Sequence, residues 1–181
     1  FIAVIEGIYR RMDEAEAALA LDESRPVEAL TDFIRFVLGY YRRNPDFVTL
    51  LNTENLHKGK HISKSLRARE YSSHAIAIIE RIVEAGVKQG LFRASVSARD
   101  LYLLIAATGY FYTSNRYTLS AFMGEPLESP EAVAHWEQFV IETVLRTVDA
   151  STSAEEEAVV NATHEEDKSW QKQQPAASRA R

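Results

Sequence analysis

Apolar residues recur at intervals of three and four along most of the first 149 residues, with glycine or proline in the breaks. This spacing is typical of amphipathic helices that share one core. No window alternates apolar and polar residues with a period of two, so we expect no strands. The predicted helices cover residues 1–21, 26–43, 46–57, 62–88, 97–122 and 130–149. The fold class is therefore all-α, a bundle of about six helices.

The ends of several helices carry recognisable signals. Ser97 has Asp100 three residues later, which predicts an N-cap with a capping-box partner. Ser129 precedes Pro130, a cap followed by a proline in the first turn. Gly90 follows the fourth helix in the place of a C-terminal glycine.

The segment from Leu101 to Tyr112 is apolar on every side when it is drawn as a helix. Such a helix must be covered from two directions, and this one is too short to span a membrane. The helix over 130–149 is also apolar over most of its surface. We therefore expect the two to pair with their symmetry mates in a four-helix interface across a two-fold axis.

Several apolar and polar side chains on these two helices are expected to form the interface. The predicted dimer residues are Tyr110, Phe111, Tyr117, Trp136, Phe139, Val140 and Thr143.

Composition divides the chain into two parts. Residues 1–149 form the predicted ligand-binding and dimerisation domain, whereas residues 150–181 are rich in Ser, Thr, Glu, Gln, Lys and Ala, a composition typical of a disordered tail. The sequence holds no cysteine, which excludes disulfides, zinc-thiolate sites and cysteine nucleophiles. Its net charge of −5 argues against direct binding to a phosphate backbone.

Glu54, His57 and His61 stand three and four residues apart, a spacing that would place metal ligands on one helical face. A di-iron site needs a second Glu-x-x-His element, and none occurs. Lys58 and Lys60 would also repel a cation. We therefore expect a solvated helix end here, with no metal site and no cofactor.

The sequence lacks the usual signatures of nucleophilic or phosphate chemistry. It has no Gly-x-Ser-x-Gly elbow, no phosphate-binding glycine loop and no His-Glu-x-x-His motif. We therefore expect a protein that is not an enzyme. A helical metal enzyme of the di-iron kind and a helical interaction module without a ligand stay open as alternatives.

Polar residues on otherwise apolar helices suggest a small-molecule pocket inside the bundle. The alternative is that they bond to one another or to the backbone. The excess of tyrosines favours the pocket. The candidate residues are Tyr40, Glu54, Asn55, Tyr71, His74, Tyr102, Tyr112 and Asn115, with Arg116 nearby.

Four segments together resemble the C-terminal half of tetracycline-repressor (TetR/AcrR) family regulators. They are Phe1 to Ile8, Asn44 to His57, Gly90 to Arg93 and Phe111 to Ser120. The resemblance covers residues 1–149. It implies an all-helical effector-binding domain that forms a homodimer through its last two long helices, with the ligand among the preceding helices.

The resemblance also implies partners and a location. A small-molecule effector would control operator binding by a helix-turn-helix head, which this sequence does not contain. We expect DNA to be bound through that head alone, and we expect a cytoplasmic protein with no membrane partner. The first helix would carry the effector signal to the head.

Overall fold

The computed structural model describes residues 2–65 and 68–151, with the backbone alone for residues 68–73. This part of the chain contains helices and no strand, so the all-α prediction is confirmed. The helices are α1 (Ile2–Ala17), α2 (Pro26–Arg43), α3 (Pro45–Leu56), the 3-10 helix η1 (Ile62–Lys64), α4 (Ala68–Lys88), α5 (Ala98–Met123) and α6 (Pro130–Val148).

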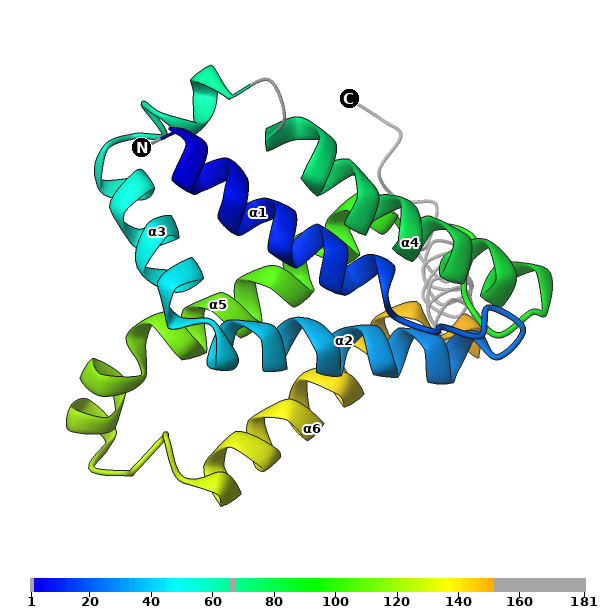
Figure 1. The fold of residues 1–181 in the computed structure, drawn as a ribbon. Coiled ribbons are helices and arrows are strands. Elements are labelled where there is room, and N and C mark those ends of the chain that lie inside the picture. Colours follow the sequence, from blue (N-terminus) through cyan, green and yellow to red (C-terminus); the bar gives the residue numbers. More distant parts are fainter. Residues whose placement is uncertain (1, 66–67, 152–181) are drawn as a thin grey trace, which may run out of the picture.

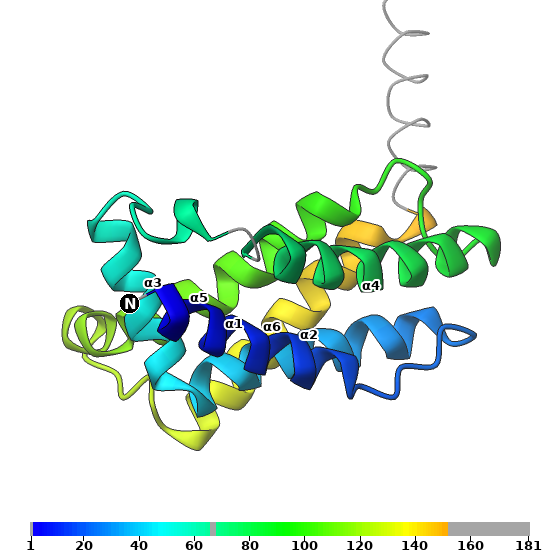
Figure 2. The ribbon, with the colours of Figure 1, turned by 45° about the horizontal axis from the view of Figure 1, so that its top comes forward.

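Helix α2 is the centre of the bundle and packs on α4, α5 and α6. In Figure 1, α1 and α4 lie side by side above α2, and α6 lies below it. Figure 2 shows α3 near the N-terminal end of α1. Fully buried side chains from four helices meet in the core, among them Phe33, Ile82, Ile105 and Val144.

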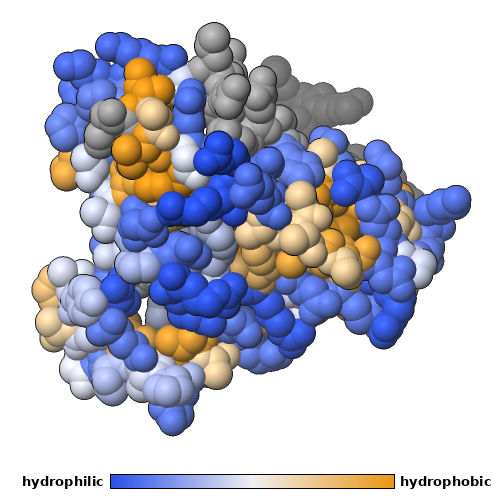
Figure 3. All heavy atoms as spheres, viewed as in Figure 1, coloured by the Kyte–Doolittle hydropathy of each residue, from blue (hydrophilic) through white to orange (hydrophobic). Residues whose placement is uncertain are grey.

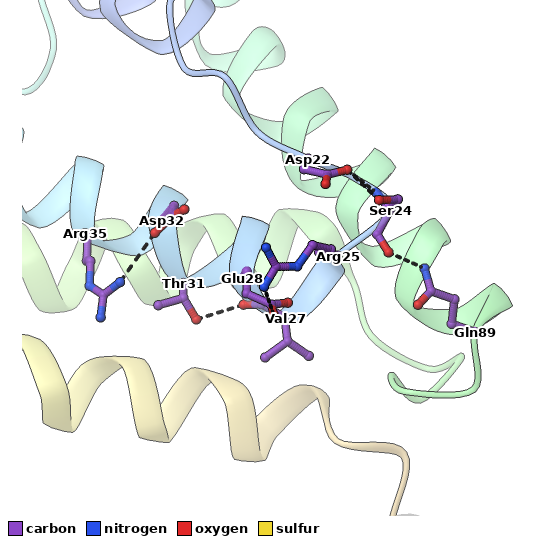
Figure 4. Close-up of polar contacts among 9 residues, drawn as sticks. All are labelled: Asp22, Ser24, Arg25, Val27, Glu28, Thr31, Asp32, Arg35 and Gln89. Carbon is purple, nitrogen blue, oxygen red and sulfur yellow. Dashed lines mark hydrogen bonds and ion pairs between the residues drawn. The ribbon is translucent and has the colours of Figure 1, made fainter.

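Hydrogen bonds stabilise the turn between α1 and α2 and connect it to the end of α4 (Figure 4). The Asp22 carboxylate accepts hydrogen bonds from the hydroxyl of Ser24 at 2.6 Å and from its backbone N–H at 3.0 Å, and these bonds hold the pKa of Asp22 below its usual value. The Gln89 amide, just beyond α4, donates to the Ser24 carbonyl at 3.1 Å. The turn after α1 is thus tied to the end of α4.

The predicted N-caps at Ser97 and Ser129 are confirmed. The Ser97 hydroxyl accepts from the backbone N–H of Asp100 at 3.2 Å, and that of Ser129 accepts from Ala132 at 3.1 Å. Because each cap satisfies an otherwise free N–H group, both helices begin where the sequence indicates.

Two predicted helix limits were wrong. The first helix ends at Ala17, since the chain leaves helical geometry before the Asp22 turn. The fourth was expected to begin at Ile62, but residues 62–64 form a 3-10 turn and Ser65 is extended, with φ −82° and ψ 120°. The extended backbone at Ser65 ends this short turn, and α4 starts at Ala68.

The surface is mostly hydrophilic on the face drawn in Figure 3, with hydrophobic residues in separate areas. None of the described helices is both long and apolar enough to cross a membrane. The predicted tail lies outside the described residues from 152 onward.

Candidate functional site

A cavity of about 320 Å³ lies among α1, α2, α3, α4 and α5. Its walls are mainly apolar and aromatic, with a small number of polar groups. The lining residues are Tyr9, Met12, Asp13, Glu16, Tyr41, Phe47, Leu51, Asn55, Ala75, Tyr102, Leu103, Ala106, Ala107 and Tyr110. A concave apolar space with a few placed polar groups is the usual form of a small-molecule site.

The space exists because small side chains occupy the middle of its walls. Ala106 and Ala107 lie on the cavity face of α5, one turn from Tyr102 and one turn from Tyr110, and Ala75 lines the wall from α4. Alanine fills little volume between these larger residues. The small side chains at the middle of this face of α5 therefore leave the space that forms the cavity.

An aromatic cluster forms the end of the cavity nearest α3. The Phe47 ring lies 5.4 Å from the Tyr9 ring and 5.8 Å from the Tyr41 ring, measured between centroids. The Tyr110 ring lies 6.3 Å from that of Tyr41, and its hydroxyl donates to the side-chain oxygen of Asn52. Edge-to-face and tilted contacts of this kind stabilise the cluster.

Three tyrosines of the cavity wall stay neutral over the physiological range. Burial raises the pKa of Tyr9 to about 12, and it also raises the pKa values of Tyr41 and Tyr102. Neutral phenols are both donors and acceptors. The cavity therefore offers a ligand aromatic faces and hydroxyl groups together.

The opposite end of the cavity carries charge. Nδ1 of His74, on α4, lies 2.7 Å from Oδ1 of Asp13, on α1. Glu16, one turn along α1, is 3% exposed. Burial and, to a smaller extent, the Asp13 carboxylate raise the pKa of Glu16 to about 8. At pH 7 this side chain is mostly a neutral acid in the cavity wall.

Two of the predicted ligand residues line the cavity. Tyr102 lies in the α5 wall, and Asn55 is an exposed residue of the α3 wall. His74 is one contact away, through Asp13. The side chain of Tyr71 lies outside the described part of the chain.

Four other predicted ligand residues are not among the residues lining this cavity. Tyr40 packs on the rings of Phe36 and Phe47 in the core. The Asn115 amide donates to a carbonyl of its own helix. The remaining two are Glu54 and Tyr112.

Glu54 closes the loop after α3. Its carboxylate accepts from the backbone N–H groups of His61 and Ile62, at 3.1 and 2.9 Å, and lies 2.7 Å from Nδ1 of His61. Although burial opposes it, these contacts lower the pKa of Glu54. His57 instead contacts the Thr53 carbonyl at 2.8 Å. The Glu54, His57 and His61 set is thus engaged in loop structure.

Tyr112 belongs to a second, smaller cavity. Its ring stacks on Trp136 at 5.1 Å and its hydroxyl donates to the Leu127 carbonyl at 2.7 Å. This cavity has a volume of about 160 Å³ and is also lined by Arg42 and Arg116. The structure therefore distributes the predicted polar set over several places and brings only part of it to the first cavity.

Sequence reasoning missed much of the wall on α1. Tyr9, Met12, Asp13 and Glu16 all line the cavity, and none of them was among the candidate ligand residues. The available signal was Glu16, which falls on the apolar stripe one turn after Met12. An acidic residue in that position indicates a polar site or an ion pair.

Four of the predicted dimer residues are exposed. The exposed fractions of Phe111, Tyr117 and Phe139 are 56%, 62% and 53%, and Thr143, one turn after Phe139 on α6, is also exposed. Trp136 is half-buried between the rings of Tyr112 and Phe139.

Two of the predicted dimer residues do not lie on the exposed surface. Val140 is 2% exposed because it packs into the core of this chain. Tyr110 faces the cavity and is bonded to Asn52. On α5, residues that line the cavity and residues on the outer surface are only a few positions apart in sequence. The helix is apolar on every side, so its sequence pattern does not distinguish the two faces.

Comparison with known proteins gives two matches. Residues 26–144 match the model of the family described as tetracyclin repressor-like, C-terminal domain. The chain is also 44% identical over 146 residues to the HTH-type transcriptional repressor NicS of Pseudomonas putida. That alignment covers 81% of this chain and 69% of the relative.

Proposed function

The chain belongs to the tetracyclin repressor-like C-terminal domain family, and we propose on this premise that it is the effector-sensing part of a transcriptional repressor. Since this is a family of transcriptional regulators, the chain is a ligand-binding and dimerisation domain and not an enzyme. Operator DNA would be bound through a helix-turn-helix head, in the cytoplasm. The observation that supports effector sensing is the 320 Å³ cavity.

The cavity is suited to a small molecule with an aromatic ring and polar substituents. Phe47 and the tyrosines offer ring faces at one end, and Asp13 and Glu16 offer polar groups at the other. A ligand of this kind buries apolar area against the rings while its substituents reach the hydroxyls and carboxyls.

Helix α1 is the element that connects occupancy of the cavity to movement. Tyr9, Met12, Asp13 and Glu16 place one whole face of α1 against the cavity. A ligand that fits better when α1 takes one of two positions shifts the population toward that position. We propose that this shift is transmitted to the head and lowers operator affinity.

The exposed apolar residues of α5 and α6 support a homodimer. Phe111, Tyr117 and Phe139 are more than half exposed, which is unfavourable for large apolar side chains in a monomer. Two copies of α5 and α6 would bury them in a four-helix interface.

A thermal-shift screen with aromatic acids, amines and phenols tests the effector proposal. A ligand that binds only the folded chain raises the melting temperature, and the shift grows with the logarithm of ligand concentration relative to Kd. Leu51→Trp fills the cavity from α3 and should abolish the shift. Leu91→Trp, at an exposed position after α4, is the matched control and should retain it. A hit whose shift survives in the folded Leu51→Trp variant contradicts this location.

Light scattering tests the dimer. Phe139→Glu places a charge on the proposed interface and should yield monomers at micromolar concentration. Leu91→Glu changes an exposed residue in the turn between α4 and α5 and should leave a dimer. A wild-type chain that is monomeric, or a Phe139→Glu variant that stays dimeric, contradicts the proposed interface.

A further inference from the structure

We infer that Asp13, Glu16 and His74 form a binding site for one divalent transition-metal ion at the charged end of the cavity. The metal site is inferred from the positions of these three side chains alone. Its proposed role, which is to present the ion to an effector in the cavity, rests on the proposed function.

The three side chains converge from two helices. Asp13 and Glu16 are one turn apart on α1, and His74 faces them from α4. One potential ligand atom from each lies within 4.8 Å of the others. Donor atoms around a zinc ion lie about 3.3 Å apart, given metal–ligand distances near 2.1 Å. Changes of at most about 1.5 Å in the distances between these ligand atoms therefore convert the cluster into a coordination site.

Glu16 is the independent observation that points to a ligand. Its side chain is 3% exposed and lines the cavity, yet it has no hydrogen bond or ion pair to any other residue that the structure describes. Buried carboxyl groups are normally paired or bound to metal. Within the same described part of the chain, neither Asp13 nor Glu16 forms an ion pair with a lysine or arginine.

The donor set selects the kind of ion. One imidazole and two carboxylates suit zinc, manganese, iron or cobalt, whereas magnesium and calcium favour oxygen donors alone. Two carboxylates also balance the charge of a divalent ion. Three protein ligands leave at least one coordination position open.

The open position faces the space where the effector is proposed to bind. Asp13 and Glu16 both line the cavity, so an ion held between them is reached from inside it. A carboxylate, phenolate or ring nitrogen of the effector would complete the coordination. The site would thus favour effectors that carry a metal-binding group.

Isothermal titration of the chelator-stripped 181-residue chain with Zn²⁺, without any effector, tests the site. We expect one ion per protomer at this site, and Mg²⁺ should not compete. Asp13→Asn and His74→Gln should each weaken zinc binding by at least about tenfold. His135→Gln, an exposed histidine on α6, is the control and should bind like the wild type.

Cobalt gives a second readout that does not depend on affinity. Co²⁺ in a site of low coordination number absorbs visible light, and this absorption should appear in the wild type and in His135→Gln but be absent from folded Asp13→Asn. Circular dichroism confirms folding. Zinc binding that persists in both Asp13→Asn and His74→Gln, or the absence of any ion bound per wild-type protomer, overturns the inference.

The proposed metal site and the proposed effector cavity can each be contradicted without the other. Leu51→Trp lies on α3, which contributes no ligand to the triad, and should keep zinc while losing the effector. If effector binding is lost in Leu51→Trp but is unaffected by a chelator and zinc does not bind, the metal site alone is wrong. If zinc binds and no effector responds to Leu51→Trp, the effector cavity is wrong.

Discussion

Glu16 and Glu54 are two glutamates with nearly equal burial and opposite surroundings. They are 3% and 4% exposed. Glu54 accepts two backbone N–H groups and contacts the His61 ring, and its pKa is lowered. Glu16 has no such donors among the described residues, and burial raises its pKa to about 8. The donors around Glu54 thus outweigh the effect of burial on its pKa, whereas nothing among the described residues offsets that effect at Glu16.

This difference also separates structure from function. The Glu54 carboxylate holds the chain between α3 and η1, so its oxygens already accept hydrogen bonds from the protein. The Glu16 carboxyl faces a cavity and has no hydrogen-bond partner among the described residues. A buried polar group without a partner is the better indicator of a ligand site.

The largest expected effect comes from Glu16→Gln, measured without metal. Folded wild type keeps a proton on Glu16 that the unfolded chain releases, so its stability falls as pH rises from the unfolded pKa toward about 8. From about pH 5.5 to about pH 8.5 the wild type should lose at most about 3 kcal/mol of unfolding free energy relative to Glu16→Gln. Urea unfolding of both chains at several pH values measures this.

The groups around Glu16 are common to both proteins in that comparison. They are Asp13 on α1, His74 on α4, Tyr102 on α5 and Tyr41 on α2. Parallel pH profiles for the two chains would contradict the raised pKa of Glu16.

Glu54→Gln should show the opposite pH dependence and a smaller effect. A lowered pKa stabilises the folded chain above the unfolded value, and this stabilisation is lost as pH falls through the folded pKa. The wild type should therefore be more stable than Glu54→Gln at neutral pH, with the gap closing as the pH falls through the lowered pKa of Glu54. Urea midpoints from neutral to acidic pH test this; a gap that stays constant contradicts it.

His61→Ala should have the smallest effect of the three. It removes the ring that lies 2.7 Å from Glu54 but leaves both backbone donors in place. The loss in unfolding free energy should be about 1 kcal/mol at neutral pH, because one of three contacts is lost. Thermal melts of His61→Ala and Glu54→Gln compare the two losses of stability. A larger loss in His61→Ala than in Glu54→Gln would contradict the main role given to the backbone donors of the Glu54 carboxylate.

The fold was predicted well because its signals are local. Ser97 and Ser129 cap their helices as expected, and Pro26, Pro45 and Pro130 stand in first turns. The predicted start at Ile62 was wrong because the chain turns there instead of continuing as a helix. Apolar spacing alone does not distinguish a 3-10 turn from the first turn of an α-helix.

The site was predicted only in part because its residues come from distant positions. Tyr102 and Asn55 were identified as polar groups on apolar helices, and both line the cavity. The same rule also selected Tyr40, which packs in the core. Polarity on an apolar face shows that a residue needs a partner, but it does not show whether that partner is protein or ligand.

The sequence by itself determined the helices, their caps and their apolar faces, because these depend on residues three or four positions apart. Only the tertiary structure decided that Glu16 meets His74, since that contact requires α1 to pack beside α4. It also decided that one face of α5 is hollow, because alanines open a cavity only where larger side chains from other helices surround them.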